Sequence, residues 1–224
     1  MQVVKSVVPV TPNDLLLRKK SVLLTKNLVL GKSVYGESFV QEPQGEYRLW
    51  RPQVSKLCAA FVKGMVLDIK PTSCILYLGA STGSSLSHLS DLCPQGIIFG
   101  VDSAPRVVRE LVFLSEERNN IVPILTSARN PEIYAGRVCK TDIIYQDVAV
   151  RDQVSMFLKN MELFLEQSGV AVLCLKTRCI DCTKKPELVA SVAEQELNKS
   201  TCVIESYCLA PFYKDHWVFV CKKK

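Results

Sequence analysis

Several polar side chains stand where the sequence places the ends of apolar segments. Asp147 and Lys176 each follow a strongly apolar stretch. His216 opens the last such stretch, and Lys56 lies on an amphipathic segment. Ligands of open α/β sheets bind at the carboxyl ends of parallel strands, so Asp147 and Lys176 are candidates for proton transfer there. Lys176 acts as a base only if its ammonium loses a proton near neutral pH, which burial or a second cation favours. His216 is either a core histidine or a proton relay, and Lys56 alone indicates only a solvated charge.

A glycine-containing loop supplies a second candidate site, for a nucleoside cofactor. The loop lies between an apolar strand and a helix, and its candidate residues are Gly79, Ala80, Gly83, Ser84 and Ser85. Glycine permits a sharp turn, and the N–H groups that open the helix can bind an anionic group. Asp102 ends the next strand, 23 residues after Gly79, where an acid can accept hydrogen bonds from ribose hydroxyls. The pattern alone does not separate NAD from S-adenosylmethionine, but the chain leaves no residues for a separate substrate domain.

The spacing of apolar residues predicts an α/β fold after residue 50. The expected strands are 74–78, 97–101, 121–125, 142–147, 170–176, 201–209 and 216–221. The expected helices are 54–69, 84–92, 105–118, 154–166 and 186–197, the fourth closed by Gly169. Helical crossovers predict a parallel sheet covered on both faces, whereas the last two strands have no helix between them and form an antiparallel hairpin. This order resembles the Rossmann-like fold of S-adenosylmethionine-dependent methyltransferases.

The first fifty residues have a different pattern. Short apolar runs at 3–10, 22–25 and 28–30 alternate with prolines and glycines, which predicts small antiparallel strands. We therefore place a domain boundary near Trp50, with a β-rich domain at 1–50 and a methyltransferase domain at 51–224.

Composition and charge restrict the class of protein. The 224 residues are 48% hydrophobic and 22% charged, which excludes disorder for the bulk of the chain, and no apolar window predicts a membrane span. The net charge is +6, and residues 1–56 hold nine basic against four acidic residues. A basic surface fits a polyanionic partner such as nucleic acid, although charge alone equally fits a solvated face.

Cysteine usage indicates a reducing compartment. Ten cysteines occur, several of them inside apolar runs, and no signal peptide is expected. Cys179 and Cys182 form a single CxxC, and because no second ligand pair stands at suitable spacing we predict no metal site.

Several sequence blocks resemble the fibrillarin family over roughly residues 23–221. They are LTKNLV at 24–29, SVYGE at 33–37, YRLWRP at 47–52, SKL at 55–57, DVA at 147–149, KTRCID at 176–181 and DH at 215–216. The resemblance implies guide-RNA-directed 2′-O-methylation of ribose in ribosomal RNA, with S-adenosyl-L-methionine as cofactor and a possible second activity on a histone glutamine. It also implies the catalytic residues Lys56, Asp147, Lys176 and His216, of which Asp147 is expected to contact the cofactor as well.

The same resemblance implies partners and a location. The family acts in a box C/D particle with a guide RNA, a Nop-domain scaffold protein and a kink-turn-binding protein. A nucleolar location is expected, with an archaeal cytoplasm as the alternative.

The expected cofactor pocket departs from the family pattern near the adenine. Asp102 and Ser103 stand where the family usually has Glu-Phe, Ser127 with Ala128 where it has Asp-Ala, and Val150 where it has glutamine. Loss of an aromatic, a carboxylate and an amide predicts weaker cofactor binding. An alternative is therefore a non-catalytic docking component of the same particle, although the intact set of four catalytic residues favours an enzyme.

Overall fold

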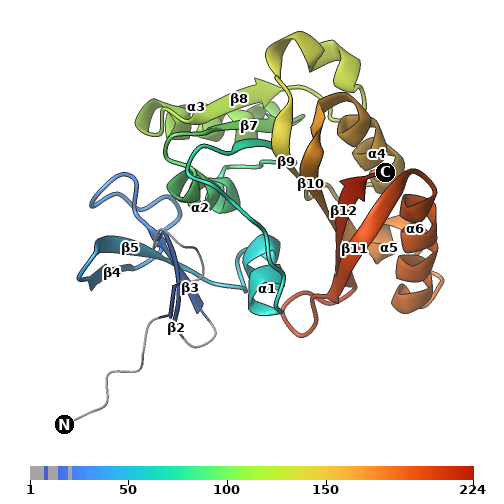
Figure 1. Cartoon of the computed structure of the whole chain (residues 1–224), viewed down its shortest axis with the longest axis horizontal. Helices are drawn as coiled ribbons and strands as arrows, with labels where there is room; N and C mark the ends of the chain where they lie inside the picture. Colours follow the sequence, from blue (N-terminus) through green and yellow to red (C-terminus); the bar gives the residue numbers. More distant parts are fainter. Residues whose placement is uncertain (1–7, 10–14, 20–21) are drawn as a thin grey trace.

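The structure, a computed structural model, describes residues 8–9, 15–19 and 22–224, and its strands form two sheets (Figure 1). Of the apolar run predicted at 3–10, only residues 8–9 belong to the described residues. The small antiparallel sheet has the order β1-β2-β3-β5-β4. Its strands are β1 (Val8–Pro9), β2 (Leu16–Lys19), β3 (Val22–Lys26), β4 (Phe39–Glu42) and β5 (Gly45–Trp50).

The large sheet has the order β11-β12-β10-β9-β6-β7-β8. Its strands are β6 (Cys74–Leu78), β7 (Ile97–Asp102), β8 (Ile121–Leu125), β9 (Thr141–Gln146), β10 (Leu165–Lys176), β11 (Thr201–Cys208) and β12 (His216–Lys223). Neighbouring strands from β6 to β10 are parallel, and β12 is antiparallel to both β10 and β11. The predicted α/β fold with an antiparallel last strand is confirmed.

Helices cover both faces of the large sheet (Figure 1). One face packs against α1 (Lys56–Val62), α2 (Ser84–Leu92) and α3 (Pro105–Glu117). The other packs against the 3-10 helix η1 (Pro131–Arg137), α4 (Gln153–Phe164) and α6 (Pro186–Ser200), while α5 (Thr177–Ile180) follows β10 directly. Within the described part of the chain, every helix is too short or too polar to cross a membrane.

Two predicted helices end differently in the structure. The helix expected at 54–69 is shorter, because Gly64 follows α1 with φ +109° and the chain continues in an irregular segment. The helix expected to close at Gly169 ends at Phe164, and Gly169 lies within β10. A side chain at Gly169 would stand 2.9 Å from the carbonyl oxygen of Asp142, so this glycine is required by close strand packing and not by a helix end.

A buried charge network joins the small sheet to α2 and α3. Arg48 on β5 is fully buried; its Nε donates to Glu37 at 2.6 Å and its guanidinium also donates to Asp91 at 2.8 Å. Arg118, just after α3, donates to the other Asp91 oxygen at 2.7 Å. Two guanidinium groups thus balance two carboxylates. Removing one partner of a buried ion pair typically lowers the free energy of unfolding by about 3–5 kcal/mol, because the other charge is left buried without a partner.

His88 on α2 extends this network. Its Nδ1 lies 2.7 Å from the hydroxyl oxygen of Thr25, and its Nε2 lies 2.7 Å from the hydroxyl of Tyr35. Since Thr25 donates its own hydrogen to Asp91 at 2.7 Å, we assign the ring proton to Nδ1. Burial, together with the charges of Arg48 and Arg118, holds the pKa of His88 well below its ordinary value, so the buried ring is neutral.

The neutral histidines predict a pH dependence of stability. The chain has two, and burial lowers the pKa of both His88 and His216. Below about pH 6.5 the unfolded chain therefore binds more protons than the folded chain. The free energy of unfolding should hold its full value above pH 6.5 and fall as the pH decreases, by up to about 1.4 kcal/mol per pH unit for each histidine.

Urea unfolding of the wild type and of His88→Gln between pH 7.5 and 5.5 checks this. The variant should be less stable at pH 7.5 but show a smaller loss on acidification, with His216→Asn as the matched comparison. An equal loss in the wild type and in His88→Gln would contradict a neutral buried ring.

Candidate active site

Asp147 and Lys56 form an ion pair at the carboxyl edge of the large sheet. The two carboxylate oxygens accept hydrogen bonds from Lys56 Nζ at 3.0 and 2.9 Å. Asp147 follows β9 and its N–H donates to the carbonyl of Leu78; Lys56 opens α1, where Ser55 caps the helix. Burial tends to lower the pKa of Lys56, but the charge and hydrogen bond of Asp147 outweigh it and hold that pKa above its usual value. Lys56 is therefore a cation that fixes Asp147.

Lys176 and His216 face each other on adjacent strands. Lys176 ends β10, His216 begins β12, and the two are direct partners in the antiparallel ladder. His216 is only 9% exposed, and its Nδ1 lies 2.6 Å from the carbonyl oxygen of Lys214. Because a carbonyl can only accept, Nδ1 carries the hydrogen and Nε2 keeps its lone pair in the neutral ring. Burial, together with the charges of Lys56 and Lys176, lowers the pKa of His216 and favours this neutral form.

A buried glutamine, which the sequence analysis missed, holds Lys176 in place. Gln153 Oε1 accepts from the N–H of Lys176 at 2.9 Å, and its Nε2 donates to the carbonyl oxygens of Lys176 at 3.0 Å and Val150 at 2.9 Å. The side chain thus joins the end of β10 to the loop that follows Asp147. A polar residue at a helix start was the only sequence signal, and such residues are common there.

The predicted glycine loop brings its backbone against Asp147. Gly79 has φ +82°, and a side chain there would stand 2.4 Å from the carbonyl oxygen of Asp147. Gly83 precedes α2 with φ +87°, and a side chain there would meet Leu114 at 2.5 Å. Both positions therefore require glycine for conformation and for space. The first turn of α2 is tied to the residue before Lys56, since the hydroxyl of Ser85 donates to Ser55.

A cavity of about 80 Å³ lies beside this loop and gathers six of the predicted cofactor residues. They are Gly79, Asp102, Ser103, Ser127, Ala128 and Val150. Asp102 accepts one hydrogen bond on each oxygen, from the N–H of Ser81 at 2.9 Å and of Ala104 at 3.0 Å. A carboxylate offers about four lone-pair positions, so Asp102 can accept further hydrogen bonds from a ligand.

The remaining predicted cofactor residues lie around the loop and not on the cavity wall. Ala80 is buried, Gly83 caps α2, and the hydroxyl of Ser85 donates to Ser55 at 2.9 Å. Ser84 opens α2 and lines a separate hollow. Helix-opening N–H groups have no partner inside a helix, so the backbone of Ser84 and Ser85 can serve an anion. Free N–H groups at the start of α2 and a carboxylate with unused lone pairs are the kinds of group that bind a nucleoside carrying an amino-acid carboxylate.

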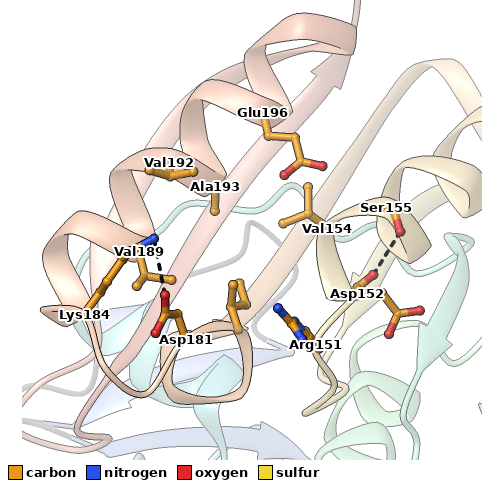
Figure 2. Close-up of a pocket in the computed structure, with 11 residues that line it drawn as sticks. Arg151, Asp152, Val154, Ser155, Asp181, Lys184, Val189, Val192, Ala193 and Glu196 are labelled. Atoms are coloured by element: carbon orange, nitrogen blue, oxygen red, sulfur yellow. Dashed lines mark hydrogen bonds and ion pairs between the residues drawn. The ribbon is translucent and has the colours of Figure 1, made fainter.

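A second cavity, of about 310 Å³, lies between α4, α5 and α6 (Figure 2). Figure 2 shows Asp181 paired with Lys184 on one side, at 3.3 Å, and Arg151 on the opposite side. Its apolar lining includes Val154 from α4 and Val189 from α6. It holds none of the predicted site residues.

The sheet order and the site at its carboxyl edge define a Rossmann-like methyltransferase. A sequence model described as Fibrillarin matches residues 14–224. The chain therefore belongs to the fibrillarin family, as the sequence blocks predict.

Individual relatives agree with this membership. The chain is 45% identical, over 203 residues and 90% of both chains, to the fibrillarin-like rRNA/tRNA 2′-O-methyltransferase of Thermococcus onnurineus. It resembles the structure of Aeropyrum pernix fibrillarin in complex with natively bound S-adenosyl-L-methionine, with TM-score 0.83, 37% identity and 92% of each chain covered. It also resembles fibrillarin in a fibrillarin/Nop5p complex, with TM-score 0.86, 35% identity and coverage of 94% of this chain and 98% of that one.

Proposed function

We propose that this chain transfers a methyl group from S-adenosyl-L-methionine to a ribose 2′-hydroxyl of ribosomal RNA, selected by a guide RNA in a box C/D particle. The observation that carries the proposal is the Lys56–Asp147 ion pair beside the glycine loop, with Lys176 and His216 facing each other nearby. The Thermococcus onnurineus relative is named an rRNA/tRNA 2′-O-methyltransferase, which favours RNA over a histone glutamine as substrate.

Different predicted residues would contact different parts of S-adenosyl-L-methionine. The N–H groups of Ser84 and Ser85 would bind the methionine carboxylate, and Asp102 would accept from the ribose hydroxyls. Ser103, Ser127, Ala128 and Val150 would surround the adenine, while Gly79, Ala80 and Gly83 let the backbone approach. When bound, the cofactor supplies an electrophilic methyl on its sulfonium.

The residues at the carboxyl edge of the sheet that would remove the proton of the target hydroxyl are Lys56, Asp147, Lys176 and His216. Asp147, held by Lys56, would orient Lys176 against the target hydroxyl so that the oxygen is aligned for in-line attack, and alignment of this kind supplies several kcal/mol. Lys176 would take the hydroxyl proton as the general base. His216 presents the lone pair of Nε2 to the ribose, because its Nδ1 is committed to Lys214.

The partners and location follow the relatives. A Nop-domain scaffold is favoured because a similar structure is a fibrillarin/Nop5p complex. The guide RNA and a kink-turn-binding protein complete the proposed particle. The relatives named above are archaeal, which favours an archaeal cytoplasm over a nucleolus.

We further propose a division of the chain into domains at 1–50 and 51–224. The small sheet ends at Trp50, and α1, with the catalytic Lys56, packs on the large sheet. The buried ion pair of Arg48 and Asp91 then connects the two domains.

Removing the catalytic groups should abolish transfer without preventing assembly. In the reconstituted particle, Asp147→Ala or Lys176→Ala should lower the rate of methyl transfer at least about 100-fold, since each removes an aligned or proton-accepting group. Lys185→Ala, at an exposed lysine before α6, is the matched control and should keep the wild-type rate. Methyl incorporation into guided RNA measures the rate, and gel filtration measures assembly. Transfer retained in both catalytic variants would reject the residue assignment, whereas a wild-type particle that assembles but transfers nothing would favour the docking-only alternative.

Restoring a carboxylate beside the adenine should strengthen cofactor binding. Ser127→Asp should lower the dissociation constant of S-adenosyl-L-methionine by about fivefold, because a charged acceptor makes stronger hydrogen bonds than a hydroxyl. Isothermal titration calorimetry measures the constant. Ser191→Asp, at an exposed position of α6, introduces the same charge away from the cavity and should change nothing. Equal affinity in Ser127→Asp and the wild type would contradict the adenine placement.

A further inference from the structure

Tyr213 contacts two of the proposed catalytic residues from the connection between β11 and β12. Its ring centroid lies 5.4 Å from Lys56 Nζ, within the range of a cation–π interaction. The same ring packs edge-on against His216, with centroids 5.8 Å apart and an interplanar angle of 63°. The connection is fixed at both ends, since Tyr213 N–H donates to Leu209 and Leu209 N–H donates to His216. One half-buried side chain therefore joins α1 to the start of β12.

We propose that Tyr213 is a positioning residue for methyl transfer, whose ring holds Lys56 against Asp147 and shields His216 from water. The proposal rests on the proposed function, because it assigns Tyr213 a part in the reaction of those residues. It adds a residue that the predicted catalytic set does not contain.

The ring of Tyr213 adds a restraint to the flexible side chain of Lys56. A lysine stem has four rotatable bonds, and fixing them costs conformational entropy. Asp147 holds the ammonium of Lys56 through two hydrogen bonds, and the aromatic face of Tyr213 adds a further contact. Burial and the nearby Asp147 carboxylate raise the pKa of Tyr213, so its hydroxyl stays neutral and the ring, not a phenolate, acts on Lys56.

The ring also sets the surroundings of His216. The ionisable groups that act on this histidine are Lys56 from α1, Asp147 after β9 and Lys176 at the end of β10, together with the carbonyl of Lys214. The two lysines disfavour a charged ring, whereas Asp147 and the carbonyl favour it. Burial disfavours it most, and Tyr213 supplies part of that burial. Removing the ring should therefore admit water and raise the pKa of His216 toward its ordinary value.

The test compares Tyr213→Leu, Tyr213→Phe and the matched control Phe212→Leu. Histidine-labelled full-length chain is titrated by NMR between pH 5 and 8. The chain has two histidines, and the fully buried His88 serves as a non-titrating reference. Methyl transfer by the reconstituted particle is measured in parallel.

Tyr213→Leu should move the titration midpoint of His216 upward and lower kcat about two- to fivefold, with KM for S-adenosyl-L-methionine unchanged. Tyr213→Phe keeps the ring and should match the wild type in both respects, as should Phe212→Leu.

An unchanged midpoint and kcat in Tyr213→Leu would overturn the proposal while leaving the proposed function standing, since the wild type still transfers. The proposal would also be overturned if Phe212→Leu raised the titration midpoint of His216 and lowered kcat as Tyr213→Leu does. That result would indicate general loosening of the connection between β11 and β12. A raised midpoint with unchanged kcat would mean that the ring shields His216 without serving the reaction, which also overturns it. Absence of transfer by the wild-type particle would overturn this proposal and the proposed function together.

Discussion

The ion pair between Lys56 and Asp147 is the contact on which the site depends, because it joins groups 91 residues apart in the chain. Its carboxylate stands at the end of a central parallel strand, and its ammonium opens a helix that precedes the sheet in sequence. A partly buried carboxylate needs a partner of this kind, because an isolated charge away from water is costly. The glycine loop then packs against the Asp147 backbone so closely that Gly79 has no space for a side chain. The glycine loop, the ion pair and the end of β9 thus form one unit.

The small sheet helps to place the helix that carries Lys56. It ends at Trp50, shortly before the cap of α1, and the buried network of Arg48, Asp91 and Arg118 ties it to α2 and α3. The serine that caps α1 also bonds to the first turn of α2, so the helix carrying Lys56 and the helix of the glycine loop are held together. Buried ion pairs of this kind are weak evidence for stability, but they demand one arrangement of their partners. We infer that the network fixes where α1 begins, and with it the position of Lys56.

Much of the fold could be predicted from the sequence, because the alternation of strands and helices predicts a parallel sheet and the missing helix before β12 predicts its antiparallel direction. Helix ends were less predictable. The apolar spacing after α1 continues past Gly64 although the backbone does not, and the long irregular pairing of β10 with β9 places Gly169 inside a strand. The four edge residues were identifiable through strand ends and family blocks. Gln153 and Tyr213 were not, since their roles depend on contacts across the fold that no local pattern records.

We propose that this sheet edge transfers a methyl group to a ribose 2′-hydroxyl. The most direct test of this function is to identify the methylated atom in RNA treated with the reconstituted particle and S-adenosyl-L-methionine, by nuclease digestion and mass spectrometry. We expect one 2′-O-methylated nucleotide at the position selected by the guide RNA, and no methylated base. Methyl groups on bases or on protein, with the guided ribose unmodified, would contradict this function.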